Sequence, residues 1–248
     1  MPKRRIVAVS ADEAWNNFLI EAFEDTASEV ELVKTNQEAS SMLRKGVPDV
    51  LFVHQKLLTK PLLAMLGTLR ISRPDLRAFG LGSNPLQETA GSLFRFDFSF
   101  DGTLPSLSEF QKKLAPHLPV PEPIRLAVVD DEPDVREILR DYFAHRTHPA
   151  FEVRTAANGE EGEKVIYEFS PHVVILDIKM PEKDGRELYR DLKKKGRLPP
   201  TIVFFDVVSS DEVAEIKKWG RPAFVEKGSQ SSGMQEMSAL VKKLAYFG

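Results

Sequence analysis

Acidic residues end two short apolar runs in the second half of this sequence, and a lysine follows a third run. The four residues are Asp130, Asp131, Asp177 and Lys227. Three carboxylates brought together raise one another's pKa values unless a cation lies among them, and Mg²⁺ is the simplest such cation. A carboxylate beside a bound metal can attack a phosphoryl group, and a lysine can hold a phosphoryl oxygen. We therefore predict that Asp177 accepts a phosphoryl group.

Helix capping offers an alternative explanation, since aspartate is favoured at helix N-termini. Capping would explain any one of these aspartates. It does not explain a pair, a third aspartate and a lysine that each follow a separate apolar run. We therefore favour a shared site over three independent caps.

The elements that must position these residues alternate regularly along residues 124–248. Strands are predicted at 124–129, 150–154, 172–176, 201–205 and 223–226. Helices are predicted at 133–145, 158–169, 185–195, 210–219 and 232–246. Five strands alternating with helices imply an α/β fold with a parallel sheet covered on both faces, and the flavodoxin-like order 2-1-3-4-5 is the natural choice. In such sheets, sites form beyond the carboxyl ends of the strands beside strand 1.

The first half of the chain repeats the same order of signals. Arg5–Asp12 resembles Arg125–Glu132, and Pro48–His54 matches Pro171–Asp177. Any two α/β halves share hydrophobic periodicity, but several aligned segments in one order favour a duplication. We therefore predict two flavodoxin-like (βα)5 domains.

Prolines divide the chain near its middle. Four of them lie within Ala115–Pro123. Proline removes a backbone donor and restricts the residue before it, so this stretch predicts an extended linker. The predicted domains are residues 1–117 and residues 124–248, joined by a proline-rich linker at 118–123.

The first half has lost the residues that could do this chemistry. The positions of the acidic pair, the acceptor, the end of strand 4 and the lysine fall at or near Ser10-Ala11, His54, Gly82 and Asp101. We predict that this half binds neither Mg²⁺ nor a phosphoryl group. His54 could bind a metal or carry a phosphoryl group, but a lone histidine in place of a lost aspartate more often does neither. Alternating phenylalanines are predicted to pack in the core or in an interface; they are Phe94, Phe96, Phe98 and Phe100.

Composition excludes several classes of protein. The chain has 42% hydrophobic and 29% charged residues, which is typical of a soluble globular protein. No apolar run approaches the ~20 residues of a membrane helix, and the basic start MPKRR is not followed by the apolar region of a signal peptide. The absence of cysteine excludes disulfides and suits a cytoplasmic location. A net charge of -3 argues against dominant electrostatic binding to nucleic acid.

Residues 124–248 resemble the receiver domains of bacterial two-component response regulators. The resemblance rests on four motifs, which are Val129–Glu132 (VDDE), Leu176–Pro181 (LDIKMP), Asp184-Gly185 and Phe224–Lys227 (FVEK). The first two motifs together are specific, and the last is weak alone. The first half then resembles a pseudo-receiver, that is, a receiver fold without the phosphorylation chemistry.

The resemblance implies a role for each site residue. Asp177 would be the phospho-acceptor, with Lys227 in contact with the phosphoryl group. Mg²⁺ would be bound directly by Asp131, through water by Asp130, and by the backbone carbonyl of Lys179. Phe224 stands where receivers carry the aromatic residue that moves on activation.

Two positions depart from the receiver pattern. Receivers usually have threonine or serine at the end of strand 4, where this chain has Asp206. Two unit charges ~4 Å apart interact by about 4 kcal/mol at an effective dielectric near 20, so Asp206 would repel a phosphoryl group. Asp206 therefore points away, adds to the metal site, or disfavours phosphorylation.

The second departure is Gly228, which stands where receivers have a proline that follows a cis peptide bond. A cis peptide bond without proline costs about 2.5–4 kcal/mol, so we predict a trans bond and a rearranged loop after the last strand.

The resemblance implies a non-enzymatic, cytoplasmic response regulator that takes its phosphoryl group from a sensor histidine kinase or a phosphotransfer protein. Its output would be contact with a downstream protein, with the first half as a docking or dimerisation module, and with neither nucleic acid nor membrane as partner. The alternative is a scaffold that is never phosphorylated and uses both folds for docking. A third possibility is the N-terminal part of a larger enzyme or transcription factor.

Overall fold

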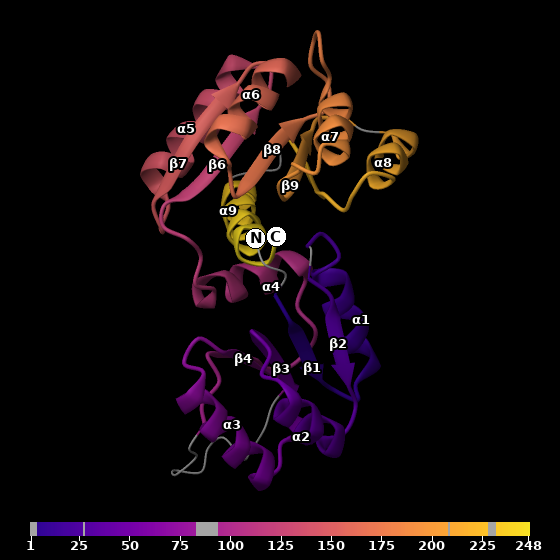
Figure 1. The fold of residues 1–248 in the computed structure, drawn as a ribbon, viewed down its shortest axis with the longest axis vertical. Helices are drawn as coiled ribbons and strands as arrows, with labels where there is room; N and C mark the ends of the chain where they lie inside the picture. Colours follow the sequence, from indigo (N-terminus) through magenta and orange to yellow (C-terminus); the bar gives the residue numbers. More distant parts are fainter. Residues whose placement is uncertain (1–3, 27, 83–93, 208, 228–231) are drawn as a thin grey trace. The chain divides into compact units, whose positions relative to one another are not determined.

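The computed structural model describes residues 4–26, 28–82, 94–207, 209–227 and 232–248. The chain divides into two compact units, Met1–His117 and Leu118–Gly248 (Figure 1). Val120, in the segment predicted as a linker, packs against the core of the second unit. Among the described residues, no helix is long and apolar enough to cross a membrane.

The second unit is built on a five-stranded sheet. Its strands are β6 (Ile124–Val129), β7 (Phe151–Ala156), β8 (Val173–Asp177), β9 (Thr201–Phe205) and β10 (Ala223–Glu226). They lie in the order β10-β9-β8-β6-β7, and all neighbouring strands are parallel. Counted from the start of the unit, this order is 2-1-3-4-5, as predicted.

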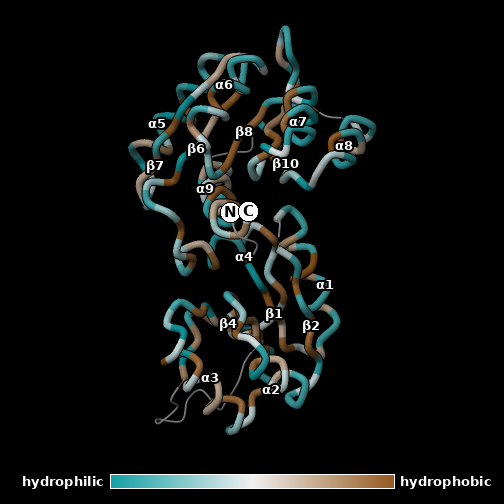
Figure 2. The backbone as a smooth tube through the Cα atoms, viewed as in Figure 1, coloured by the Kyte–Doolittle hydropathy of each residue, from teal (hydrophilic) through white to brown (hydrophobic). Residues whose placement is uncertain are grey.

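Helices cover both faces of this sheet (Figure 1). They are α5 (Pro133–Arg146), α6 (Gly159–Phe169), α7 (Gly185–Lys194), α8 (Ser210–Lys217) and α9 (Ser232–Phe247). Successive side chains of a strand point to opposite faces. Accordingly, Val128 packs in the layer with α5 and α9, and Val129 packs in the layer with α6 and α7. Strands buried on both faces read as continuous apolar runs, which Figure 2 shows as brown tube along β8.

The first unit has the same topology. Its strands are β1 (Ile6–Val9), β2 (Val30–Val33), β3 (Val50–His54), β4 (Arg77–Leu81) and β5 (Phe98–Phe100), in the order β2-β1-β3-β4-β5. Its helices are α1 (Glu13–Ala22), α2 (Asn36–Lys45), α3 (Lys60–Ser72) and α4 (Leu107–Leu114), with short 3-10 turns at Gln55–Leu57 and Ala115–His117. The fold class predicted from the sequence, two flavodoxin-like units with one strand order, is confirmed.

Aromatic packing fills much of the core of the first unit. Phe110 of α4 lies against Phe52 of β3 and stacks on Phe100 of β5, with ring centroids 6.0 and 4.7 Å apart. Two of the four alternating phenylalanines, Phe94 and Phe100, are each 3% exposed. These two residues therefore contribute to the core.

Candidate functional site

The carboxyl ends of three strands of the second unit bring the predicted site residues together. Asp130 directly follows β6, Asp177 is the last residue of β8, and Lys227 directly follows β10. The carboxyl ends of parallel strands meet at one edge of the sheet. At that edge Asp130 is 1% exposed and Asp177 is 6% exposed.

Lys227 contacts three carboxylates at this edge. Its Nζ lies 3.0 Å from Asp130 Oδ2, 3.1 Å from Asp177 Oδ2 and 3.0 Å from Glu132 Oε1. The first two contacts unite residues that the sequence predicted, whereas Glu132 was not predicted as a site residue. It precedes α5 at the N-cap position but makes no side-chain capping bond, so its carboxylate is available for the lysine. The position of Glu132 directly after Asp130 and Asp131 was the one sequence feature that could have identified it as a site residue.

The three carboxylates form a compact group. Oxygens of Asp130, Glu132 and Asp177 all lie within 4.8 Å of one another, and this is the one such group of three possible metal ligands in the part of the chain that the structure describes. Asp131, predicted as a direct Mg²⁺ ligand, is partly exposed and stands outside this group. Arg136 of α5 fixes the backbone here, because its Nη1 donates to the carbonyl oxygens of Asp130 and Asp131 at 2.6 and 2.8 Å.

The segment that carries Lys179 connects Asp177 to α7. The Lys179 N–H donates to Asp177 Oδ1 at 3.2 Å, so it helps to orient the carboxylate of the predicted acceptor. The side chain of Lys179 is exposed, and its carbonyl was predicted as a metal ligand. Gly185 begins α7 so close to β8 that a Cβ there would overlap the Asp177 carbonyl oxygen. Glycine is therefore required where α7 meets the site.

Ion pairs hold this segment against α6. Lys183 Nζ lies 2.8 Å from Glu163 Oε2 and 2.9 Å from Asp191 Oδ2. The carbonyl oxygen of Lys183 accepts the N–H of Gly159 at 3.0 Å. These contacts join the start of α6, the segment after β8 and α7, and so they limit how far the segment beside Asp177 can move.

The site has an excess of negative charge. Burial lowers the pKa of Lys227, but the hydrogen bonds to Asp130, Glu132 and Asp177 outweigh burial and raise that pKa above its usual value. Burial also raises the pKa of Asp130, against the hydrogen bonds from Lys227 and from the Glu132 N–H. When ionised, three carboxylates and one ammonium leave a net charge of -2. A divalent cation with oxygen ligands matches both the charge and the donor atoms.

The two residues predicted at the switch lie in or beside β9 and β10. Asp206 directly follows β9, is exposed, and stands outside the carboxylate group. Phe224 of β10 is partly buried, with its ring centroid 6.4 Å from that of Phe205. Gly228, predicted to follow a trans peptide bond, lies outside the described residues.

The equivalent edge of the first unit has a different set of contacts. His54 is 5% exposed; its Nδ1 accepts the Lys56 N–H at 3.3 Å, and its Nε2 lies 3.8 Å from Asp12 Oδ2. Burial lowers the pKa of His54, and Asp12 only partly opposes this effect. Ser10 is fully buried and accepts the Asp12 N–H at 3.1 Å. Over the described ranges this unit has no group of three possible metal ligands, and that it binds no Mg²⁺ stays a prediction.

Two further positions of that edge were assigned through the duplication. Gly82, at the strand-4 position, has φ +73°, and a Cβ there would lie 3.4 Å from His54 Nε2. Asp101, at the lysine position, is exposed. Neither residue places a cation beside His54.

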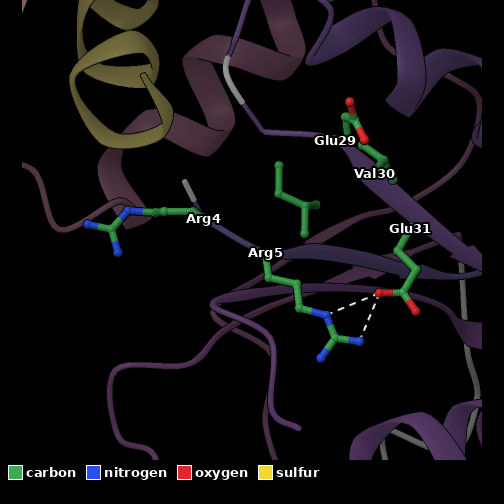
Figure 3. A pocket seen from close by; sticks show the side chains of 6 residues that line it. Arg4, Arg5, Glu29, Val30 and Glu31 are labelled. Atoms are coloured by element: carbon green, nitrogen blue, oxygen red, sulfur yellow. Dashed lines mark hydrogen bonds and ion pairs between the residues drawn. The ribbon is translucent and has the colours of Figure 1, made fainter. Parts of the chain in front are cut away.

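The opposite edge of the first sheet has a hollow of about 480 Å³ where β1 and β2 begin (Figure 3). Arg4, Arg5, Glu29, Val30 and Glu31 contribute to its lining. Arg5 Nη2 lies 2.8 Å from Glu31 Oε2, and Arg5 Nε donates to the same oxygen at 3.1 Å. Two arginines and two glutamates balance the charge of the lining, so the hollow has no evident charge preference for a ligand.

Comparisons with known proteins match about half of the chain or less. Residues 126–239 match the family model described as the response regulator receiver domain. The chain is 35% identical over 114 residues to protein-glutamate methylesterase/protein-glutamine glutaminase 2 of Koribacter versatilis, a match that covers 45% of this chain and 31% of that protein. It is 37% identical over 112 residues to the probable C4-dicarboxylate response regulator DctR of Bacillus subtilis, covering 45% of this chain and 49% of that protein.

A solved structure matches over a similar share of the chain. The response regulator domain of Thermotoga maritima CheB is 24% identical, and the match covers 50% of this chain and 97% of that domain with a TM-score of 0.44. The chain spans from 31% to 49% of the lengths of the two relatives named above.

Proposed function

We propose that the second unit, of which residues 126–239 match the family model of the response regulator receiver domain, accepts a phosphoryl group on Asp177. The observation that carries the proposal is the convergence of Asp177 with Lys227 and two further carboxylates at one edge of the sheet. An Asp177 oxygen forms the new bond to phosphorus, and the bond from phosphorus to the donor breaks, leaving its electron pair on the donor. Lys227 then holds a phosphoryl oxygen as a point charge.

We further propose Mg²⁺ as the cation of this site. Asp130, Asp177 and the Lys179 carbonyl would hold it, together with a carboxylate from Asp131 or Glu132. Bound Mg²⁺ stabilises the negative charge that develops during phosphoryl transfer. The support is the net charge of -2 among Lys227 and the three carboxylates, together with the all-oxygen donor set.

The partners follow from the receiver domain as proposals. The phosphoryl group would come from a sensor histidine kinase or a phosphotransfer protein, and the output would be contact with a downstream protein. The first unit, which lacks the carboxylate group, would serve docking or dimerisation. One relative is named as a methylesterase, but the match covers only 31% of it, so we propose a signalling role without assigning catalysis to this chain.

A scaffold that is never phosphorylated is the second candidate. Asp206 favours it, because a carboxylate at the end of β9 replaces the hydroxyl that receivers usually have there. The two candidates differ in one measurable property, the uptake of a phosphoryl group.

Mass spectrometry of the full chain after treatment with acetyl phosphate and Mg²⁺ tests the proposal. We expect the wild type to gain the mass of one phosphoryl group and Asp177→Asn to gain none. Asp211→Asn, which changes an exposed aspartate of α8, is the matched control and should behave as the wild type. Uptake by Asp177→Asn would show that the acceptor is wrong, and no uptake by the wild type would favour the scaffold.

A further inference from the structure

Helices α7 and α8 end in the same sequence pattern. Lys193–Arg197 reads KKKGR and Lys217–Arg221 reads KKWGR, so both follow the form K-K-x-G-R. In each case the helix ends within the pattern, at Lys194 in α7 and at Lys217 in α8. The two segments are far apart in sequence, and the fold determines whether their charges meet.

The fold brings the two segments side by side. Lys194 Nζ lies 5.2 Å from the centroid of the Trp219 ring, which joins the end of α7 to the end of α8. Gly220 packs so closely on Tyr189 of α7 that a Cβ there would overlap the tyrosine hydroxyl. On the other side of α7, the Arg197 guanidinium lies 5.8 Å from the ring centroid of Tyr167, near the end of α6 (Figure 1).

We call the exposed cations of these two segments the basic surface. They are Lys193, Lys194, Lys195, Arg197, Lys217, Lys218 and Arg221. Lys195 pairs with Glu163. Within the described ranges, the other six have no acidic partner. Lys194, Arg197 and Lys217 each lie over an aromatic ring, whereas Lys193, Lys218 and Arg221 contact neither an acid nor a ring. Unpaired like charges held close together repel one another, and an anionic partner would relieve that repulsion.

Compensation of the helix dipoles explains only part of this surface. Cations in the last turn of a helix stabilise its negative end, and Lys193, Lys194 and Lys217 lie in such turns. Lys218 is a C-cap residue, and Arg197 and Arg221 lie beyond the helices, where the dipole effect falls off. The surface therefore has more cations than its helix ends need.

We propose that the basic surface binds a short acidic segment of a partner protein. The chain has a net charge of -3, and without these seven cations the remainder has a net charge of -10. A long polyanion such as nucleic acid would extend beyond the basic surface and be repelled by the negatively charged remainder of the chain. A short acidic segment can stay within one Debye length, ~8 Å, of the seven cations. The ring contacts of Lys194 and Arg197 hold two of the cations in place, which lowers the cost of ordering them.

The position of the surface separates it from the phosphorylation site. Helix α7 begins beside Asp177 and has 10 residues, so its end lies about 15 Å away along the helix axis. A segment bound there leaves Asp177 accessible. The inference therefore goes beyond the proposed function and does not depend on phosphorylation.

Fluorescence anisotropy with the full chain and a fluorescein-labelled oligoglutamate peptide tests this inference. One variant combines Lys193→Glu, Lys218→Glu and Arg221→Glu, the three cations of the surface that contact neither an acid nor a ring. The control combines Lys34→Glu, Lys56→Glu and Lys60→Glu, which makes the same charge change at exposed lysines of the first unit. We expect the first variant to raise the Kd roughly tenfold or more and the control to leave it about unchanged. Circular dichroism melts of both variants check that each remains folded.

Three outcomes would overturn the proposal. An equal loss in both variants would mean that overall charge, not the basic surface, binds the peptide. Tighter binding of oligothymidylate or of phosphatidylserine vesicles than of the peptide, lost in the first variant alone, would identify nucleic acid or membrane as the occupant. No measurable binding of the peptide by the wild type at low salt would exclude an acidic segment altogether.

Discussion

Glu132 and Lys227, 95 positions apart in the sequence, form an ion pair with Nζ and Oε1 at 3.0 Å. The lysine also contacts Asp130 and Asp177, and an ammonium group has three donors in all. A phosphoryl oxygen can therefore bind Lys227 only by replacing one of the three carboxylates. Glu132 has a side chain that is 54% exposed, so water can solvate it after release at less cost than the buried aspartates.

The first prediction concerns the release of Lys227 from Glu132. Glu132→Gln removes one negative charge at the mouth of the site and weakens the hold on the lysine. We expect phosphorylation by acetyl phosphate to be about threefold faster, since exposed ion pairs contribute about 0.2–1 kcal/mol. A mass-spectrometric time course measures the rate, with Glu137→Gln, an exposed change in α5, as the control. A slower rate in Glu132→Gln than in the control would mean that Glu132 assists phosphorylation.

The second prediction concerns which of the adjacent residues Asp131 and Glu132 binds Mg²⁺. The resemblance assigns direct Mg²⁺ binding to Asp131, whereas the compact carboxylate group contains Glu132. Among the described residues no cation pairs with the Asp131 carboxylate, while Lys227 already neutralises Glu132 in part. We therefore expect Asp131→Asn to weaken Mg²⁺ binding about tenfold and Glu132→Gln to weaken it less. Titration calorimetry of both variants gives the two affinities, and the reverse order would assign the metal to Glu132.

Strand β6 could be predicted from the sequence, whereas the arrangement of the three acids that follow it could not. The apolar run predicted strand 124–129, and β6 has these bounds because a strand buried on both faces must be apolar throughout. The order of three acids in VDDE does not say which carboxylate turns inward. That choice depends on Arg136, which holds the backbone, and on Lys227, which comes from the other end of the unit. Such distant contacts cannot be derived from spacing.

The first unit shows the same limit for a strand. Strand β5, Phe98–Phe100, has only three residues, and the alternating phenylalanines around it do not indicate where it begins and ends. Short strands have too little periodicity to determine their bounds, and pairing with β4 sets them instead.

The third prediction concerns the close approach of α7 to Asp177, the proposed acceptor. A methyl group at Gly185 would overlap the backbone of Asp177, so Gly185→Ala must push α7 or β8 aside. We expect a loss of about 2–3 kcal/mol in the free energy of unfolding and weaker Mg²⁺ binding. Gly196→Ala is the control, because Gly196 has open space around it and a φ of +64°. A side chain at that φ should cost about 1 kcal/mol in the free energy of unfolding without changing the affinity for Mg²⁺. Urea unfolding and calorimetry measure the two effects; unchanged Mg²⁺ affinity in Gly185→Ala would contradict the prediction.

The fourth prediction concerns pH and the first unit. Burial lowers the pKa of His54 below 6.5, so the unfolded chain takes up a proton near pH 6.5 while the folded unit does not. Because the unfolded state then binds more protons, the first unit loses stability as the pH falls through about 6.5. His54→Gln should reduce this pH dependence, and His145→Gln, an exposed change in the second unit, should not. Urea unfolding at several pH values, followed by Trp15 fluorescence in a Trp219→Phe background, reports on the first unit. Equal pH dependence with and without His54 would show that other groups cause it.

The last prediction concerns Asp206, where the chain departs most from the receiver pattern. A carboxylate at the end of β9 repels a phosphoryl group, by about 4 kcal/mol at ~4 Å and less if the exposed side chain turns into solvent. Asp206→Thr removes that charge and supplies a hydroxyl donor, so we expect it to bind beryllofluoride more tightly than the wild type at fixed Mg²⁺. The donor would also couple Asp177 to Phe224, which the wild type should leave uncoupled. A beryllofluoride titration compares Asp206→Thr with Asp211→Thr, which makes the same change at an exposed site in α8. Equal or weaker binding by Asp206→Thr would mean that Asp206 already faces away from the site or helps to hold the metal.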